Sequence, residues 1–127
     1  MKKKRKNWEA VYDAKLRELL VARNWEVAKC QIRARGHALD LFGWADFVAM
    51  GNIEGNETLV GIQNTSWGQR KKHIERYAGS EEIKRKIERW VACGCGAVMI
   101  SWKRVKKKRG GKAFTYQAVI ENLMELI

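Results

Sequence analysis

A single acid inside an apolar run constrains this chain more than any other feature. The run spans residues 41–50, and Asp46 is its only charged residue. A carboxylate buried in a strand is costly unless it is hydrogen-bonded, paired with a cation or bound to metal. The pattern predicts either a functional carboxylate or a structural one that caps a turn or pairs with Arg33 or Arg35.

A second apolar run follows at residues 59–62 and ends in Gln63, Asn64 and Thr65. Because strand side chains alternate between faces, Gln63 and Thr65 share one face. If the two runs pair as neighbouring strands, Asp46 and Gln63 converge. Carboxylate and amide oxygens are ligands that Mg²⁺ accepts. The spacing therefore predicts a site for Mg²⁺ or Mn²⁺, which could activate water against a phosphodiester.

The expected secondary structure begins with a helix over residues 8–23, capped by Asn7. Ser66 and Gln69 form a capping-box pattern that predicts a helix directly after the second run, and Ser80 begins another helical segment. We expect strands at 25–32, 41–50, 57–65, 97–102 and 114–120, loops at 33–40 and 106–112, a turn at 52–56 and a short C-terminal helix at 121–127. This order predicts one α/β domain over 1–127, with a mixed central sheet of about five strands flanked by helices on both faces.

The charge of the chain indicates a polyanionic partner. There are 26 Lys and Arg against 14 Asp and Glu, a formal net charge of +12. Nucleic acid is the polyanion that such an excess favours. Residues 1–7 are expected to be a flexible basic arm. Residues predicted to contact phosphates are Arg70, Lys71, Lys72, Lys103, Arg104, Lys106, Lys107, Lys108 and Arg109.

The cysteines and the hydropathy of the chain indicate the cellular compartment in which we expect the protein. Three cysteines cannot all pair, which favours a reducing, cytoplasmic compartment. Cys93 and Cys95 lack the further ligands of a zinc site and are expected at a tight helix-to-strand junction. No apolar run reaches the ~18 residues of a membrane span, so no membrane association is expected.

Six tryptophans are many for a chain of this size. Large aromatic side chains dominate small cores, and we expect most of the six to be buried. The tryptophans expected in the core are Trp8, Trp25, Trp44 and Trp90. Trp67 and Trp102, next to basic clusters, could instead stack on bases.

Residues 40–49, 59–66 and 70–72 together resemble the restriction-endonuclease-like nucleases of the PD-(D/E)xK superfamily. The closest resemblance is to the Holliday junction resolvase-like branch and to small phage nucleases, and it runs from about residue 8 to 102. It implies an αβββαβ core and a metal-dependent DNA endonuclease of a bacterial, archaeal or phage-infected cell. It also implies branched DNA as a substrate and a symmetric homodimer.

The resemblance assigns roles to individual residues. Asp46 matches the strand acid of the family, Gln63 falls at its glutamate position and Thr65 at its lysine position. On the first helix Asp13 matches the resolvase acid, and Glu9 lies one turn earlier. Asp40, just before the strand, is a further acid that could support the site.

Two departures from the family pattern matter for catalysis. Gln63 can ligate metal through oxygen but adds no negative charge, and Thr65 cannot act as a lysine. Lys71 or Lys72, on the following helix, could supply the missing positive charge. A catalytically inactive nucleic-acid-binding domain of the same fold, or an RNA-binding accessory protein, is the alternative.

Overall fold

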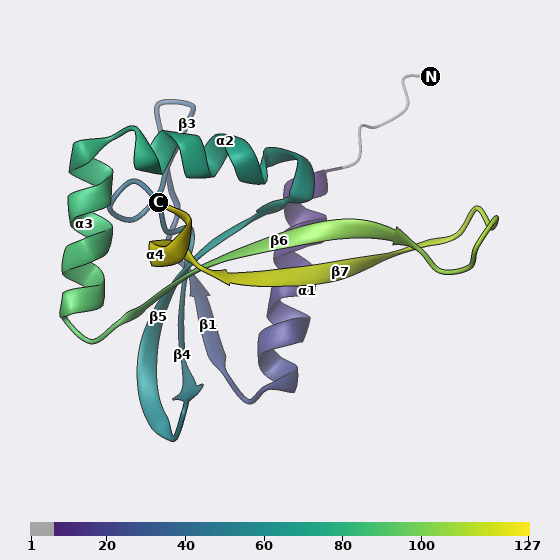
Figure 1. Ribbon diagram of the computed structural model, residues 1–127, viewed down its shortest axis with the longest axis horizontal. Helices are drawn as coiled ribbons and strands as arrows, with labels where there is room; N and C mark the ends of the chain where they lie inside the picture. The colour runs from purple at the N-terminus through teal and green to yellow at the C-terminus, as the bar shows by residue number, and fades with distance from the viewer. Residues whose placement is uncertain (1–6) are drawn as a thin grey trace.

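The computed structural model describes residues 7–127, and the predicted basic arm therefore lies almost entirely outside the described residues (Figure 1). The chain forms four α-helices and seven strands among these residues. Their bounds are α1 (Trp8–Ala22), β1 (Glu26–Lys29), β2 (Ile32–Ala34), β3 (His37–Leu39), β4 (Phe47–Ile53), β5 (Asn56–Ser66), α2 (Trp67–Ala78), α3 (Glu81–Ala92), β6 (Gly96–Lys106), β7 (Phe114–Asn122) and α4 (Leu123–Leu126).

The central sheet has five strands in the order β1-β4-β5-β6-β7. The β5–β6 pair is parallel and the other three pairs are antiparallel. Helices α2 and α3 form the crossover that a parallel pair requires. The predicted α/β class, with a mixed five-stranded sheet flanked by helices, is confirmed.

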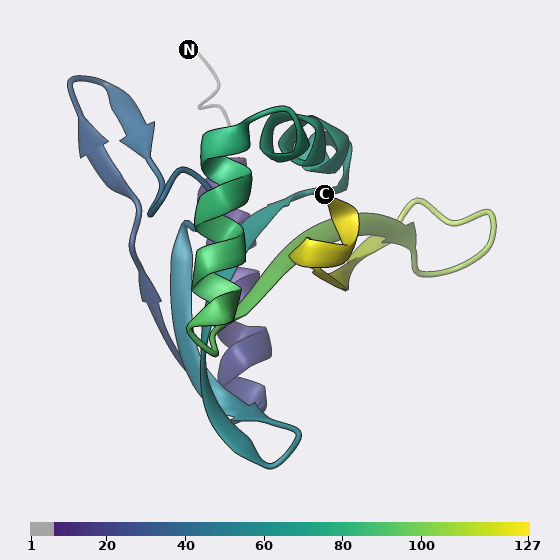
Figure 2. The ribbon, with the colours of Figure 1, turned by 60° about the vertical axis from the view of Figure 1, so that its left-hand side comes forward.

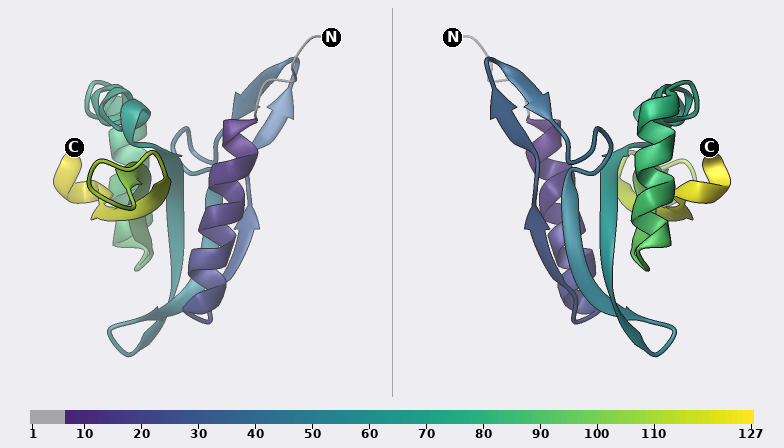
Figure 3. Two further views of the ribbon diagram at one scale, coloured as in Figure 1. Left: turned by 90° about the vertical axis from the view of Figure 1, so that its right-hand side faces the viewer. Right: turned by 90° about the vertical axis from the view of Figure 1, so that its left-hand side faces the viewer.

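Two apolar cores lie on the two faces of the sheet. Figure 3 shows α1 against one face and α2, α3 and α4 against the other. Leu16 and Leu20 of α1 pack on Phe47, Val60 and other inward residues of β4, β5 and β6. The second core surrounds buried residues of the opposite face: Trp44, Ala45, Tyr77, Ile87, Ala97, Met99 and Leu123.

The predicted strand at 41–50 is wrong in its first half. Residues 41–45 form a closed turn, in which the Leu41 and Ala45 backbones hydrogen-bond to each other in both directions. Phe42 and Gly43 have positive φ angles of 55° and 80°, which no strand contains. The strand begins only at Phe47, so Asp46 precedes β4 instead of lying within it.

The predicted loop at 33–40 is also different from the structure. The first strand ends at Lys29, and residues 32–39 form a separate antiparallel hairpin, β2–β3. Arg35 and Gly36 turn the hairpin with positive φ angles of 52° and 78°, the combination that tight two-residue hairpins require. Figure 2 shows this hairpin projecting from the body of the molecule.

The helix starts agree with the sequence in position, and two of three caps form. The Asn7 side chain accepts from the Ala10 N–H at 3.1 Å, and the Ser80 hydroxyl accepts from the Ile83 N–H at 3.2 Å. Ser66 makes no side-chain cap bond, so the predicted capping box is wrong although α2 begins at the expected place. Ser66 is instead the last residue of β5, paired with Trp102.

Two tryptophan predictions need correction. Trp8 is 45% exposed at the start of α1, where it packs on Tyr12, and is not a core residue. Trp102 is only 6% exposed, and its ring nitrogen donates to the Asn64 side chain at 2.7 Å. A ring buried in this way offers no free face to a base. Trp67, by contrast, is 42% exposed.

The small residues at 93–96 form the expected junction between α3 and β6. Cys93 ends the helix, Gly94 takes a positive φ of 90°, and the strand begins at Gly96. Within residues 7–127, no helix is long and apolar enough to cross a membrane.

Candidate active site

Asp46 lies where the chain enters β4, directly beside β5. Its N–H donates to the Ile62 carbonyl at 3.0 Å, and Phe47 pairs with Ile62 in the antiparallel ladder. Continuing that register by one residue places Asp46 opposite Gln63. The predicted convergence of Asp46 and Gln63 therefore exists, with Asp46 supplied by the strand entry.

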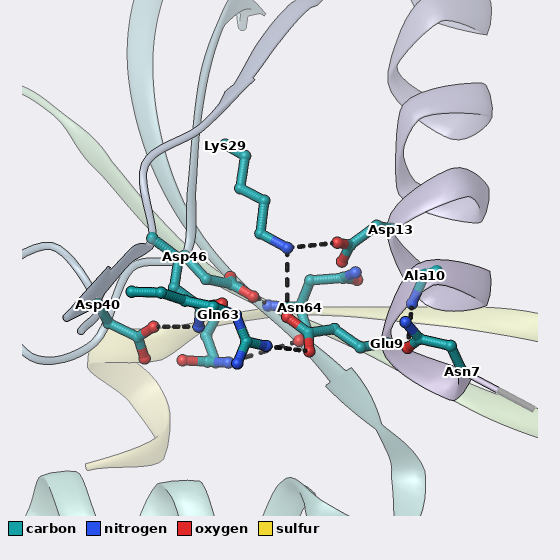
Figure 4. Close-up of polar contacts among 11 residues, drawn as sticks. Asn7, Glu9, Ala10, Asp13, Lys29, Asp40, Asp46, Gln63 and Asn64 are labelled. Atoms are coloured by element: carbon teal, nitrogen blue, oxygen red, sulfur yellow. Dashed lines mark hydrogen bonds and ion pairs between the residues drawn. The ribbon is translucent and has the colours of Figure 1, made fainter. Parts of the chain in front are cut away.

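The Asp46 carboxylate is buried without a cation beside it. It is 7% exposed, and Oδ1 accepts a hydrogen bond from the Asn64 N–H at 2.9 Å. Burial, together with smaller effects of the nearby Asp40 and Asp13 carboxylates, raises its pKa to about 8 against the opposing effect of that bond. Figure 4 shows Asp46 between Asp40 on one side and Asp13 on the other.

The expected structural alternative, an ion pair with an arginine, does not form. The Arg33 guanidinium pairs with Glu9 at 3.2 Å. Asp46 takes part in none of the ion pairs found across residues 7–127, and those ion pairs do not include Arg35. A buried carboxylate with one hydrogen bond and no cation is an expensive group to keep, which is typical of functional sites.

Gln63 is fixed by groups from three segments. One end of its side-chain amide lies 2.6 Å from both the Tyr77 hydroxyl and the Trp44 carbonyl oxygen, and 3.3 Å from Asp40 Oδ2. The carbonyl and the carboxylate only accept hydrogen bonds, so the amide nitrogen is the atom that satisfies this end. The amide oxygen then occupies the other end, 3.4 Å from the backbone oxygen of Asn64.

Asp40 belongs to this cluster as a supporting acid. Its side chain is 13% exposed and accepts from the Gln31 amide at 2.8 Å, while Arg76 lies 4.0 Å away. Asp40 also contacts the side-chain amide of Gln63, the residue that lies opposite Asp46. The sequence indicated only its position next to the apolar run and not its contact with Gln63.

The first-helix acids face Asp46 from the other side but are already neutralised. The Lys29 ammonium lies 2.7 Å from Asp13 and 3.2 Å from Glu9 (Figure 4). Burial lowers the pKa of Lys29, but its hydrogen bonds to these two carboxylates outweigh that effect and raise it. For Asp13 to join a metal site, Lys29 would have to release it.

The residues predicted to replace the family lysine do not gather at Asp46. Thr65 is 7% exposed and lies in the ladder beside Ser101. The Lys71 side chain is 85% exposed on α2, 3.9 Å from Glu75, and Lys72 is exposed as well. Neither lysine is brought to the buried carboxylate in this arrangement.

Asp46 has few potential metal ligands around it. Among residues 7–127, no three His, Cys, Asp or Glu side chains converge closely enough to hold a metal by themselves. When the Gln63 amide nitrogen faces Tyr77, the amide oxygen lies 3.4 Å from the Asn64 backbone oxygen. Carboxylate and amide oxygens are ligands that Mg²⁺ accepts.

The predicted phosphate-contacting residues divide into two groups. Arg70 forms a bidentate pair with Glu121 of β7, with both contacts at 2.6 Å. Its guanidinium is therefore already paired with a carboxylate and is not free to bind phosphate. The exposed residues Lys103, Arg104, Lys106, Lys107, Lys108 and Arg109 lie on the β6–β7 hairpin, which extends far from the body in Figure 1.

The exposed Trp67 ring connects the two groups. The Arg70 guanidinium lies 5.2 Å from its centroid and the Lys103 ammonium 5.1 Å.

Sequence reasoning missed two residues that organise the site, Tyr77 and Lys29. Tyr77 appeared only as part of a helix pattern, yet it is fully buried with its hydroxyl on Gln63. A signal was present, because a tyrosine on a buried helix face needs a polar partner. Lys29 gave no signal, since a lysine on an edge strand is ordinary.

Comparison with protein-family models, curated proteins and solved structures gave no match to this chain. The functional argument therefore depends on the site itself.

Proposed function

We propose that the protein is a metal-dependent DNA endonuclease in which Asp46 is the central metal ligand. The observation that carries this proposal is the buried Asp46 carboxylate, which lacks a cation and lies opposite the Gln63 amide. Buried charges in proteins are paired or coordinate metals. With a pKa of about 8, the unpaired acid holds a proton at neutral pH, and a divalent ion would take the place of that proton.

In this proposal the side chains have separate tasks. Asp46, with the oxygens of Gln63 and Asn64, would hold Mg²⁺ or Mn²⁺, which supplies an activated water and stabilises charge on the phosphodiester. The Asn64 N–H orients the carboxylate, and the Tyr77 hydroxyl fixes the Gln63 amide. The basic β6–β7 hairpin binds phosphates and positions the DNA without reading its sequence.

The resemblance to resolvase-like nucleases supports the same function. The order α1, β1, β4, β5, α2, β6 is the αβββαβ order that the resemblance implies, with the β2–β3 hairpin inserted after β1. Branched DNA as the substrate and a homodimer as the working form belong to the proposal through that resemblance alone.

A second candidate is a non-catalytic nucleic-acid-binding domain on the same scaffold. It is favoured by one observation, the absence of a positive side chain at the Thr65 position combined with the outward direction of Lys71. Without a lysine near the metal, less charge stabilisation is available to a developing transition state.

Cleavage assays separate the two candidates. Purified protein is incubated with plasmid DNA and with a four-way junction in Mg²⁺ or Mn²⁺, alongside Asp46→Asn and the exposed control Glu57→Gln. The endonuclease proposal expects cleavage by the wild type and the control but not by Asp46→Asn, which still binds DNA. Binding without cleavage in either metal would establish the second candidate in its place.

A further inference from the structure

A cavity away from Asp46 combines aromatic walls with positive charge. It has a volume of about 380 Å³ and lies between α3 and the turn at 41–45. The residues lining it are Phe42, Arg85, Lys86, Arg89, Trp90 and Cys93. Its size falls within the range of small-molecule sites.

Trp90 is the fixed wall of this cavity. Its ring nitrogen donates to the Gly96 carbonyl at 2.7 Å, and its ring meets that of Trp44 edge-on at 5.9 Å. Phe42 faces it with ring centroids 6.2 Å apart and is 47% exposed. The Trp90 ring is therefore held in place, while the more exposed Phe42 ring lines the opening of the cavity.

Phe42 has a backbone conformation that phenylalanine rarely adopts. A positive φ of 55° is rare for a bulky residue and costs roughly 1–3 kcal/mol. The turn around it is closed by backbone hydrogen bonds between Leu41 and Ala45, at 2.7 and 3.0 Å. The closed turn therefore holds an exposed aromatic ring at the edge of the cavity.

Two of the three cations at the cavity take part in no ion pair. Lys86 pairs with Glu82 at 2.9 Å. Arg85 and Arg89 are in none of the ion pairs found in residues 7–127, although Arg85 also lines a neighbouring cavity with Glu81, Glu82 and Glu88 and helps to lower the pKa of Glu82. Guanidinium groups bind phosphate oxygens with two parallel hydrogen bonds, so a phosphate group complements this rim.

We propose that this cavity binds one unpaired nucleotide, with the base against Phe42 and Trp90 and the phosphate on Arg85 and Arg89. Aromatic rings stack on any base, and arginines beside them hold the backbone. The same chemistry would accept a nucleotide within a single strand or a free mononucleotide. The proposal rests on the proposed function in taking nucleic acid as the partner.

A second cavity lies beside this one. It has a volume of about 480 Å³, shares Phe42 and Lys86 with the first and is also lined by Asp40. Asp40 in turn lies 3.3 Å from the Gln63 amide. The proposed nucleotide site therefore lies near the acid that contacts Gln63.

The test measures binding of a labelled 12-nucleotide single strand, a 12-base-pair duplex and unlabelled AMP as competitor, by fluorescence anisotropy without divalent metal. Phe42→Asn removes the ring and suits the positive φ, because Asn tolerates that conformation. The second variant is Arg85→Gln/Arg89→Gln. Leu59→Asn, 40% exposed on β5, and Lys15→Gln/Arg23→Gln are the matched controls.

We expect Phe42→Asn to weaken single-strand binding about tenfold, as the loss of one stacked base does, without lowering the melting temperature or changing duplex affinity. The arginine pair should weaken single-strand binding more than its control does. AMP that displaces the single strand from the wild type shows that a free nucleotide also enters; failure to displace it restricts the site to nucleotides within a strand.

Unchanged single-strand affinity in both variants, with the protein still binding DNA, overturns the nucleotide site and leaves the proposed function standing. A wild-type protein that binds the duplex but not the single strand would likewise overturn the nucleotide site and leave the proposed function standing. Binding of neither DNA nor AMP overturns the site and the proposed function together.

Discussion

The backbone N–H of Asn64 donates to the Asp46 carboxylate at 2.9 Å, which ties the entry of β4 to the end of β5. This bond aims a buried acid at the Gln63 amide on the neighbouring strand. It only partly offsets the cost of burial, which raises the pKa of Asp46 from its ordinary value of 3.8 to about 8. The folded protein therefore holds a proton on Asp46 that the unfolded chain releases.

The raised pKa predicts how Asp46→Asn changes stability with pH. Between about pH 4 and 8 the native state binds more protons at this site than the unfolded state, so its contribution to stability falls as pH rises. One pKa unit corresponds to about 1.4 kcal/mol. We expect Asp46→Asn to melt close to the wild type near pH 4 and progressively above it as the pH rises to about 8, where the difference levels off.

Differential scanning calorimetry across that pH range checks this prediction. Glu57→Gln, an exposed acid of β5, is the control and should follow the wild type at every pH. An Asp46→Asn protein whose melting difference does not change with pH would show that Asp46 is already ionised near its ordinary pKa.

Removing the Tyr77 hydroxyl should loosen the Gln63 amide. In Tyr77→Phe the Gln63 amide loses one of its three partners but keeps the Trp44 carbonyl and Asp40, and the loss of one buried hydrogen bond costs about 0.5–1.5 kcal/mol. Metal affinity should fall about 10–100-fold, as for other groups that orient ligands. Urea unfolding and metal titration test both effects. Tyr116→Phe, a partly buried ring of β7, should change neither.

Gly61 is required by the packing of Trp44. A Cβ on Gly61 would collide with the Trp44 ring, which is fully buried and cannot move away. Gly61→Ala should therefore lose about 1–3 kcal/mol of unfolding free energy. Gly68→Ala, where a Cβ meets nothing within 4 Å on α2, should instead gain about 0.4–1 kcal/mol. Equal effects of the two substitutions would contradict this packing.

The β6–β7 hairpin should determine the salt dependence of DNA binding. Each lost phosphate contact lowers the slope of log affinity against log salt by about 0.9. Lys107→Gln/Lys108→Gln should thus reduce the slope by about 2, while Lys15→Gln/Arg23→Gln, on α1 and at its C-cap, should leave it unchanged. Anisotropy titrations at several salt concentrations measure both slopes, and identical slopes would remove the hairpin from the interface.

The sequence predicted the architecture and the pairing of the two apolar runs, because both follow from local patterns. Continuing that register by one residue places Asp46 opposite Gln63. The supporting contacts were not predictable in the same way. Asp40 and Tyr77 reach Gln63 from a turn and a helix, and Lys29 reaches Asp13 across 16 residues of sequence.

The errors at the predicted strand 41–50 and the predicted loop 33–40 share one physical cause. Positive φ angles at Phe42 and Arg35 bend the chain where the hydrophobic pattern suggested a strand or gave no signal. Tertiary contacts hold these conformations, so propensity could not reveal them. The strained turn at Phe42 shortened the predicted strand, moved Asp46 to its entry and created the cavity beside Trp90.

The most direct test of Asp46 as a metal ligand is calorimetric titration of Mn²⁺ into the protein at pH 8.5, where its carboxylate is largely ionised. The account predicts one site per chain in the wild type and in Glu57→Gln, weaker binding at pH 6, and no measurable binding to Asp46→Asn. Equal Mn²⁺ affinity in Asp46→Asn and the wild type would contradict it.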